Sequence, residues 1–202
     1  MKKLFIYLMI TAAFLFPVVA HAEVKVDGFK DTVDYEISIY GENENYAEEV
    51  EKLKNAKISE TPAENAVNVY IFRGATCSHC LEAVAYFASI SEEYGKYFDL
   101  KTYEVWYNED NANLMKKVAR KLGVSDVGGV PFIVIGNKKF EGFSETMAED
   151  MVATIMDEYE KEERYDVIEK LDENNSTVVV LASTCIFVVL VGGLAVAKNK
   201  NK

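Results

Sequence analysis

Two cysteines, Cys77 and Cys80, stand three positions apart in the stretch GATCSHCLEA, with His79 between them. Cysteine and histidine side chains ligate zinc, and two neighbouring thiols also form a disulfide, which is either structural or redox-active. Spacing and residue type do not choose among these three kinds of site. The choice depends on the compartment in which the pair lies and on the elements before and after it.

The chain has too few cysteines and histidines in suitable places for a structural zinc site. A structural zinc site takes four ligands, and the chain has three cysteines and two histidines in all. His21 and Cys185 fall in the apolar segments at the two ends, which leaves Cys77, His79 and Cys80. We therefore expect no metal, and we expect no cofactor. One cysteine pair is also too few for a disulfide-stapled scaffold, so the fold must rest on its core.

The N-terminal 22 residues have the features of an export signal. Lys2 and Lys3 precede a long apolar stretch that ends in the small-x-small pattern Ala20-His21-Ala22. We predict a signal peptide over residues 1–22, cleaved after Ala22. An uncleaved membrane anchor is the alternative, because the apolar run is long for a signal.

The C-terminal segment 177–197 carries no charged residue and is predicted to span a membrane. About 20 residues at a rise of ~1.5 Å each cross the ~30 Å hydrocarbon core. A buried core helix is the alternative, but few soluble helices are apolar all round over this length. Residues 198–202, KNKNK, form a basic tail, which favours the cytoplasmic side. We therefore expect a single-pass protein of the cell membrane, with residues 23–176 outside and the tail in the cytoplasm.

The predicted outward segment is strongly acidic. It holds all 33 Asp and Glu of the chain but only 17 of the 22 Lys and Arg, a formal charge of −16. Such a surface repels nucleic acid and anionic headgroups, so we expect no nucleic-acid partner. Its length suits one domain with one core.

The pattern around the cysteines alternates strand and helix. Cys77 falls between a short β-branched run, which predicts a strand, and a segment of helical spacing. Gly136-Asn137 further on predicts a hairpin turn. The expected strands are Val67–Phe72, Phe98–Trp106, Phe132–Ile135 and Lys138–Phe143, and the expected helices are Ser78–Tyr94, Asn111–Leu122 and Thr146–Arg164.

Residues 66–163 resemble the thioredoxin family. The resemblance rests on the strand that leads into CSHC at a helix start, on the VGGVPF stretch before a hairpin, and on the final helix. It implies an α/β thioredoxin-like fold with a central mixed sheet, flanking helices and a cis-proline hairpin. It also implies that Cys77 attacks, Cys80 resolves, Pro131 is cis, and Val130 and Pro131 receive the substrate strand.

The flanking segments fit this pattern less closely. Residues 23–65 are expected to form an N-terminal extension with a first strand over Val33–Tyr40 and a helix over Tyr46–Lys57. Residues 164–176 are expected to form a charged tether. The family usually has a buried acid six residues before the first cysteine, where this chain has Ile71. Water, Glu82 or nothing takes its place.

The Ser-His pair between the cysteines resembles that of disulfide oxidases and isomerases. A helix N-terminus favours a thiolate at Cys77, and His79 is expected to add to this effect, which makes the disulfide more oxidising. A solvated His79 without redox effect is the alternative. We expect a thiol–disulfide oxidoreductase that acts on thiols or disulfides of exported proteins, with an unidentified redox partner and a membrane contact through the C-terminal helix. A reductant of exported thiols and a non-enzymatic adaptor of an export or bacteriocin-transport complex remain open.

Overall fold

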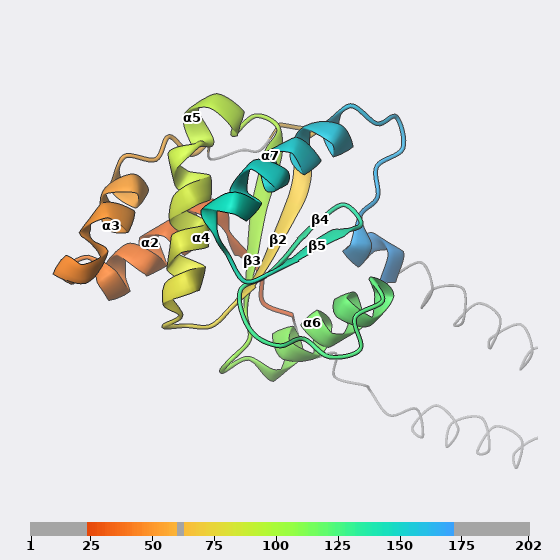
Figure 1. Cartoon of the computed structure of the whole chain (residues 1–202), viewed down its shortest axis with the longest axis horizontal. Coiled ribbons are helices and arrows are strands. Elements are labelled where there is room, and N and C mark those ends of the chain that lie inside the picture. The colour runs from red at the N-terminus through yellow and green to blue at the C-terminus, as the bar shows by residue number, and fades with distance from the viewer. Residues whose placement is uncertain (1–23, 60–62, 172–202) are drawn as a thin grey trace, which may run out of the picture.

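The computed structural model describes residues 24–59 and 63–171, which form an α/β domain (Figure 1). Helices and strands alternate over most of this length. The elements in chain order are β1 (Asp27–Gly28), α2 (Phe29–Tyr40), η1 (Glu44–Tyr46), α3 (Ala47–Lys54), β2 (Val67–Arg73), α4 (Ser78–Ser89), α5 (Ser91–Tyr94), β3 (Phe98–Glu104), α6 (Glu109–Lys121), β4 (Phe132–Ile135), β5 (Lys138–Glu141) and α7 (Glu145–Tyr159).

The sheet is mixed and its strands follow the order β1-β3-β2-β4-β5. Strand β2, which leads to the cysteines, is central: it pairs parallel with β3 and antiparallel with β4. The edge strands β1 and β5 pair antiparallel with β3 and β4. The carboxyl end of β2 is therefore held on both sides before the chain turns into α4.

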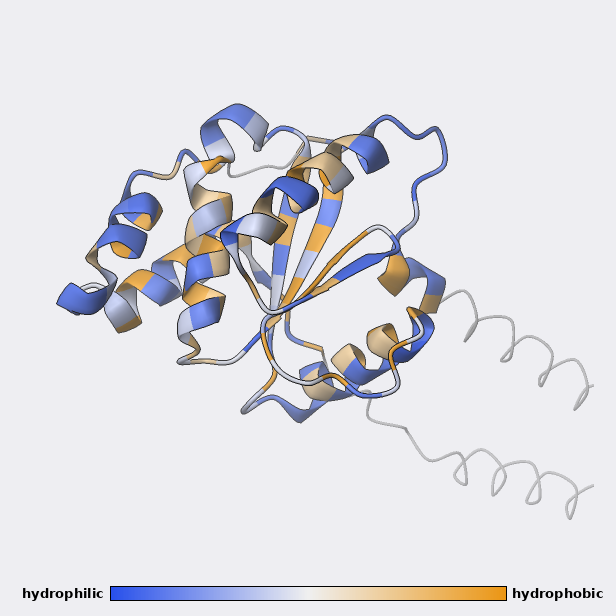
Figure 2. Cartoon of the chain, viewed as in Figure 1, coloured by the Kyte–Doolittle hydropathy of each residue, from blue (hydrophilic) through white to orange (hydrophobic). Residues whose placement is uncertain are grey.

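Both faces of the sheet are covered, as the alternation within β2 requires. Val69 and Ile71 join the core under α2, α3, α4 and α7. Tyr70 and Phe72 point to the opposite face, where α6 and residues 165–171 pack. Figure 2 shows strands rich in hydrophobic residues between helices that mix hydrophobic and hydrophilic turns. The sheet therefore has a core on each face instead of the single core expected, and the two together hold β2 in place.

The strands and helices expected after residue 66 are all present, with shifted ends. The hairpin of β4 and β5 turns at Gly136-Asn137, and Gly136 has a φ of +58°, which glycine adopts without strain. The helix expected over Ser78–Tyr94 breaks at Ile90 into α4 and α5. Strand β3 ends at Glu104 instead of Trp106.

The strand expected over Val33–Tyr40 is wrong, because these residues belong to helix α2. The stretch VDYEISIY alternates like a strand, yet its buried residues Val33, Glu36 and Tyr40 recur at helical spacing. Short amphipathic runs satisfy both periods, and tertiary packing decides between them. The edge position beside β3 is taken by β1 instead.

Part of the expected charged tether is a folded part of the domain. Helix α7 ends at Tyr159 instead of Arg164. Val167 is buried at 1% exposure, and the Asp166 carboxylate accepts hydrogen bonds from Tyr70 Oη and Asn68 Nδ2, each at 2.7 Å. Residues 164–171 are therefore packed on the second face of the sheet.

The predicted signal peptide and transmembrane segment lie outside the described residues, as do the basic tail and residues 172–176 of the tether. Within residues 24–59 and 63–171, no helix combines the length and hydropathy needed to cross a membrane.

Candidate functional site

A disulfide joins Cys77 and Cys80 at the start of α4. Cys77 is the N-cap residue, and its Sγ accepts a hydrogen bond from the backbone N–H of Cys80 at 3.2 Å. The local sequence explains this position: β2 ends at Arg73, the next three residues turn the chain, and helical spacing begins at Ser78. Unpaired N–H groups at a helix start stabilise negative charge, so Cys77 is placed to become a thiolate.

The two sulfur-bearing residues differ in exposure. Cys77 is 9% exposed and Cys80 is 0% exposed. Since a reacting thiol must reach a sulfur atom in line with the disulfide bond, Cys77 is the accessible partner. The structure thus distinguishes the two cysteines.

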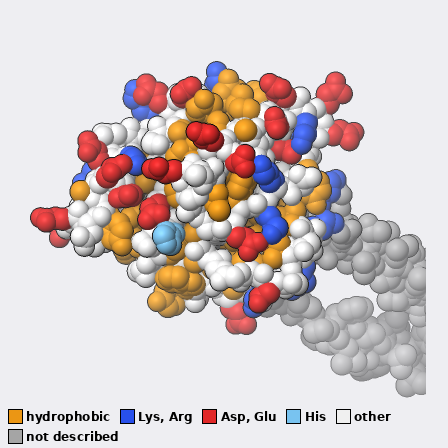
Figure 3. Space-filling view, viewed as in Figure 1, with side chains coloured by type: hydrophobic (Ala, Val, Ile, Leu, Met, Phe, Trp, Pro, Cys, Tyr) orange, Lys and Arg blue, Asp and Glu red, His pale blue; other side chains and the backbone are white. Residues whose placement is uncertain are grey.

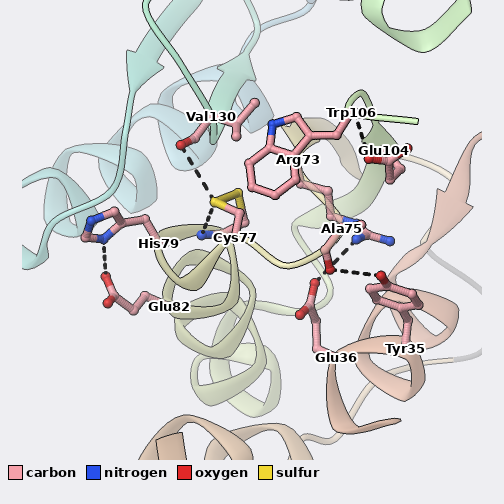
Figure 4. The surroundings of a disulfide bond; sticks show 11 residues. Tyr35, Glu36, Arg73, Ala75, Cys77, His79, Glu82, Glu104, Trp106 and Val130 are labelled. Atoms are coloured by element: carbon pink, nitrogen blue, oxygen red, sulfur yellow. Dashed lines mark hydrogen bonds and ion pairs between the residues drawn. A yellow bond between two sulfur atoms is a disulfide. The ribbon is translucent and has the colours of Figure 1, made fainter. Parts of the chain in front are cut away.

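The Val130–Pro131 peptide bond is cis, as the resemblance implies, and its loop faces Cys77 (Figure 4). The carbonyl oxygen of Val130 lies 3.8 Å from Cys77 Sγ. An oxidised sulfur carries no proton, so this contact becomes a hydrogen bond only when Cys77 is a thiol. The loop before β4 therefore places a backbone acceptor beside Cys77 Sγ.

His79 lies on the exposed surface of α4 and makes its hydrogen bond with Glu82. Its Nδ1 is 3.0 Å from Glu82 Oε2, and the side chain is 68% exposed. Figure 4 shows the ring directed toward Glu82 and away from the sulfur atoms. The expected influence of His79 on Cys77 stays a prediction, and it must act across solvent.

Trp106 covers the turn that leads to the cysteines. A side chain at Gly74 would collide with its indole, because a Cβ there would lie 2.2 Å from Trp106 Cε2. The Glu104 carboxylate accepts hydrogen bonds from the backbone N–H groups of Trp106 and Tyr107. These bonds fix a bend of the chain after β3. Trp106 is 50% exposed and Tyr107 is 83% exposed. The sequence predicts Trp106 only as the end of a strand and gives no sign of its contact with Gly74.

A buried polar cluster surrounds Arg73, whose side chain is 2% exposed. Its guanidinium lies 3.5 Å from the carboxylates of both Asp27 and Glu36. Its Nε donates to Thr102 Oγ1 at 3.3 Å, and its Cζ lies 4.4 Å from the centre of the Tyr35 ring. Strand β2, which carries Arg73, is therefore linked through this buried cation to β1, α2 and β3.

Tyr35 connects this cluster to the turn before the cysteines. Its hydroxyl donates to the backbone oxygen of Ala75 at 2.8 Å. Figure 4 shows Tyr35 and Glu36 on α2, on the side of the turn away from Val130. Helix α2 thus supports the turn that leads to Cys77.

Glu36 is the buried carboxyl group in the surroundings of the disulfide. Burial raises its pKa to about 7, and the nearby Arg73 opposes that shift. Ile71, where the family has its acid, is 0% exposed within the core, and Glu82 is engaged with His79 at the surface. Sequence reasoning missed Glu36 because it assigned this segment to a strand.

The arrangement supports thiol–disulfide exchange at a single accessible sulfur. Among the described residues, no three His, Cys, Asp or Glu side chains gather as a metal site. Comparison of the chain with protein-family models, curated proteins and solved structures finds no match.

Proposed function

We propose that the chain is a thiol–disulfide oxidoreductase with a thioredoxin-like fold, which oxidises or isomerises cysteines of exported proteins. Two features support the fold: the mixed sheet with helices on both faces, and the cis proline before the β4–β5 hairpin. The observation that carries the activity is the pair of cysteines at the start of α4. Cys77 Sγ accepts a hydrogen bond from the backbone N–H of Cys80, and Cys77 is the more exposed of the two cysteines.

The reaction begins when a client thiolate attacks Cys77 Sγ. A bond forms between the client sulfur and Cys77, the Cys77–Cys80 bond breaks, and Cys80 leaves as a thiolate that takes up a proton. A second client thiolate then attacks the client sulfur of this mixed disulfide. Cys77 leaves as a thiolate, the client is oxidised by two electrons, and the cysteine pair is reduced. An oxidising disulfide partner restores the pair.

Glu36 is the group that we assign to proton transfer at Cys80 in this cycle. Cys80 is buried, so its proton must move to or from a group inside the domain. Glu36 supplies a buried carboxyl with a pKa raised to about 7, so that both protonation states are populated at neutral pH. Glu36→Gln should slow the step in which Cys80 leaves as a thiolate and takes up a proton, and should remove a titration near pH 7 from the rate of that step.

The decisive experiment is the redox equilibrium of the Cys77–Cys80 pair against glutathione. An oxidase or isomerase gives an oxidising potential, whereas a potential near that of thioredoxin, ~−270 mV, supports a reductant of exported thiols. An adaptor is supported if cellular function survives Cys77→Ser and if neither cysteine reacts with a small disulfide.

The location belongs to the same proposal. The predicted signal and C-terminal span support a catalytic domain outside the cell membrane, where a disulfide persists. The clients are then exported proteins with free or mispaired cysteines. The redox partner is a protein or membrane oxidant that accepts two electrons from the reduced pair.

A further inference from the structure

A groove of about 640 Å³ runs beside the turn that leads to the cysteines. It lies where β1 and the start of α2 meet the bend after β3 and the start of α6. The residues that define its chemistry are Asp27, Asp31, Tyr35, Arg73, Tyr107 and Asn111. Tyr35 and Arg73 also belong to the surroundings of the disulfide in Figure 4, so the groove and the redox site share a wall.

The groove contains a buried acceptor without a donor. Asn111 is 1% exposed, and its Nδ2 donates to the backbone oxygen of Lys25 at 2.8 Å. That bond fixes the orientation of the amide, and its Oδ1 accepts no hydrogen bond from any described residue. A buried acceptor left without a donor costs about 1–3 kcal/mol, so this site favours a ligand that brings an N–H group.

The charges in the groove favour the same kind of ligand. The carboxylates of Asp27, Asp31 and Glu104 line it, against the cations Lys25 and Arg73. Arg73 is already ion-paired with Asp27 and with Glu36. Asp31 is exposed at the groove, and the Tyr107 ring, 83% exposed, offers a face on which a cation can lie.

Tyr35 links the groove to the turn that carries the cysteines. The Tyr35 hydroxyl, at the groove wall, donates to the backbone oxygen of Ala75, two residues before Cys77. On the other side of this turn, Trp106 packs over Gly74. The groove wall is therefore connected to Cys77 through the turn 74–76.

We propose that the groove binds a lysine or arginine side chain of the client polypeptide, a few residues from the client cysteine. This inference rests on the proposed function and names its substrate class: exported proteins with a basic residue near the cysteine. The cation meets Asp31 and the Tyr107 ring, beside the buried amide of Asn111. Figure 3 shows acidic side chains spread over the face in view, so general attraction must be separated from this one site.

The test uses the oxidised full chain and two peptides that differ at one position. Both carry one cysteine, and two residues further on one has lysine and the other norleucine. We expect the lysine peptide to reduce the Cys77–Cys80 disulfide roughly three- to fivefold faster at low salt, the factor of an ion pair at the surface. In 1 M salt the ratio should fall toward one.

Variants separate the groove from the general charge of the surface. The double change Asp31→Asn and Tyr107→Ala should bring the rate ratio close to one. The matched control is Asp34→Asn, which removes an exposed acid of the same helix outside the groove and should leave the ratio unchanged. A wild-type ratio near one, or an equal loss in both variants, overturns the inference while the oxidoreductase activity stands.

A binding measurement separates failure of the groove from failure of the proposed activity. Trp106 is the single tryptophan of the chain, so its emission reports on this region. Peptides with serine in place of cysteine should change this emission when they carry lysine, and the double variant should weaken their binding by at least threefold. If no peptide reduces the disulfide but lysine peptides bind, the proposed activity fails and the groove stands. If neither peptide changes the emission, the groove is rejected.

Discussion

The Oε1 atom of Glu36 lies 3.5 Å from Nη1 of Arg73, and the two side chains are only 1% and 2% exposed. Burial penalises the charged carboxylate more than Arg73 compensates, so the pKa of Glu36 rises from 4.5 to about 7. The folded state therefore holds a proton that the unfolded chain releases. Its contribution to stability is fully present below pH 4.5 and is lost as the pH rises through 7.

Glu36→Gln should remove this dependence. We expect the free energy of unfolding of the variant, relative to the wild type, to increase by about 3 kcal/mol between pH 4.5 and pH 8, because glutamine stays neutral. Urea denaturation at several pH values measures it. Asp34→Asn on the same helix is the control, and a difference that stays flat from pH 4.5 to 8 contradicts the assignment.

His79→Pro should make the Cys77–Cys80 pair more reducing by tens of millivolts. The change removes an imidazole two residues from Cys77, and for two electrons ~30 mV corresponds to ~1.4 kcal/mol of lost thiolate stabilisation. The wild-type potential should lie nearer ~−120 mV than ~−270 mV. Equilibration with glutathione measures both values.

Glu82→Gln is the matched variant for this effect. It leaves the imidazole in place but removes the carboxylate that binds Nδ1. If His79 acts on Cys77, the Glu82 change should not reproduce the reducing shift. Potentials that are the same in all three proteins would mean that His79 is a solvated surface residue.

Cys80→Ala should trap mixed disulfides with client proteins, whereas Cys77→Ala should not. Cys77 is exposed enough to react and Cys80 is not. Non-reducing electrophoresis of cells that express each variant compares the two directly. Equal trapping by both variants would mean that the accessible sulfur has been assigned wrongly.

Asp166→Ala should destabilise the domain by about 1–3 kcal/mol, because it leaves the partly buried Tyr70 hydroxyl and Asn68 amide without their acceptor. Burial and, after it, the hydrogen bond to Asp166 also raise the pKa of Tyr70. Tyr70→Phe removes the hydroxyl that donates to Asp166. The double variant, Asp166→Ala with Tyr70→Phe, should therefore lose less unfolding free energy than the sum of the losses in the two single variants. Thermal denaturation of the four proteins tests this, and full additivity would show that the bond is not formed.

Protease added to intact cells should digest the domain and spare a tag placed after Lys202. The expectation comes from the uncharged segment 177–197 and the basic tail. Permeabilised cells provide the control, in which both parts are digested. A protected domain with a cleaved tag would reverse the sidedness and remove the case for an oxidising compartment.

The elements around the cysteines were predictable because local signals and tertiary packing agree there. Strand β2 is β-branched and buried on both faces, α4 has helical spacing, and the Gly136-Asn137 turn defines the hairpin. Helix α2 was not predictable, because its apolar residues satisfy two periods at once. The error hid Glu36, since a residue placed on an edge strand gives no reason to expect a buried carboxyl group beneath the cysteines.

The contact between Trp106 and Gly74 could not be predicted from the sequence either. The two residues come from different strand ends, and only the parallel pairing of β2 with β3 brings them together. Strand pairing depends on which of several apolar runs become neighbours, and no local pattern encodes that choice. The same holds for Arg73, whose partners come from β1, α2 and β3.

The central position of β2 has a consequence for synthesis and export. The chain emerges from its N-terminus, so β2 appears before either strand that will flank it. Strand β4 is complete only about 60 residues later, which at ~5–20 residues per second is an interval on the order of 3 to 12 s. During that time at least one edge of an apolar strand is open, and the β4 strand that follows Pro131 is not yet in place beside it. The nascent protein thus resembles the unfolded clients we propose for it, and under the proposed function it is itself a substrate for mature copies.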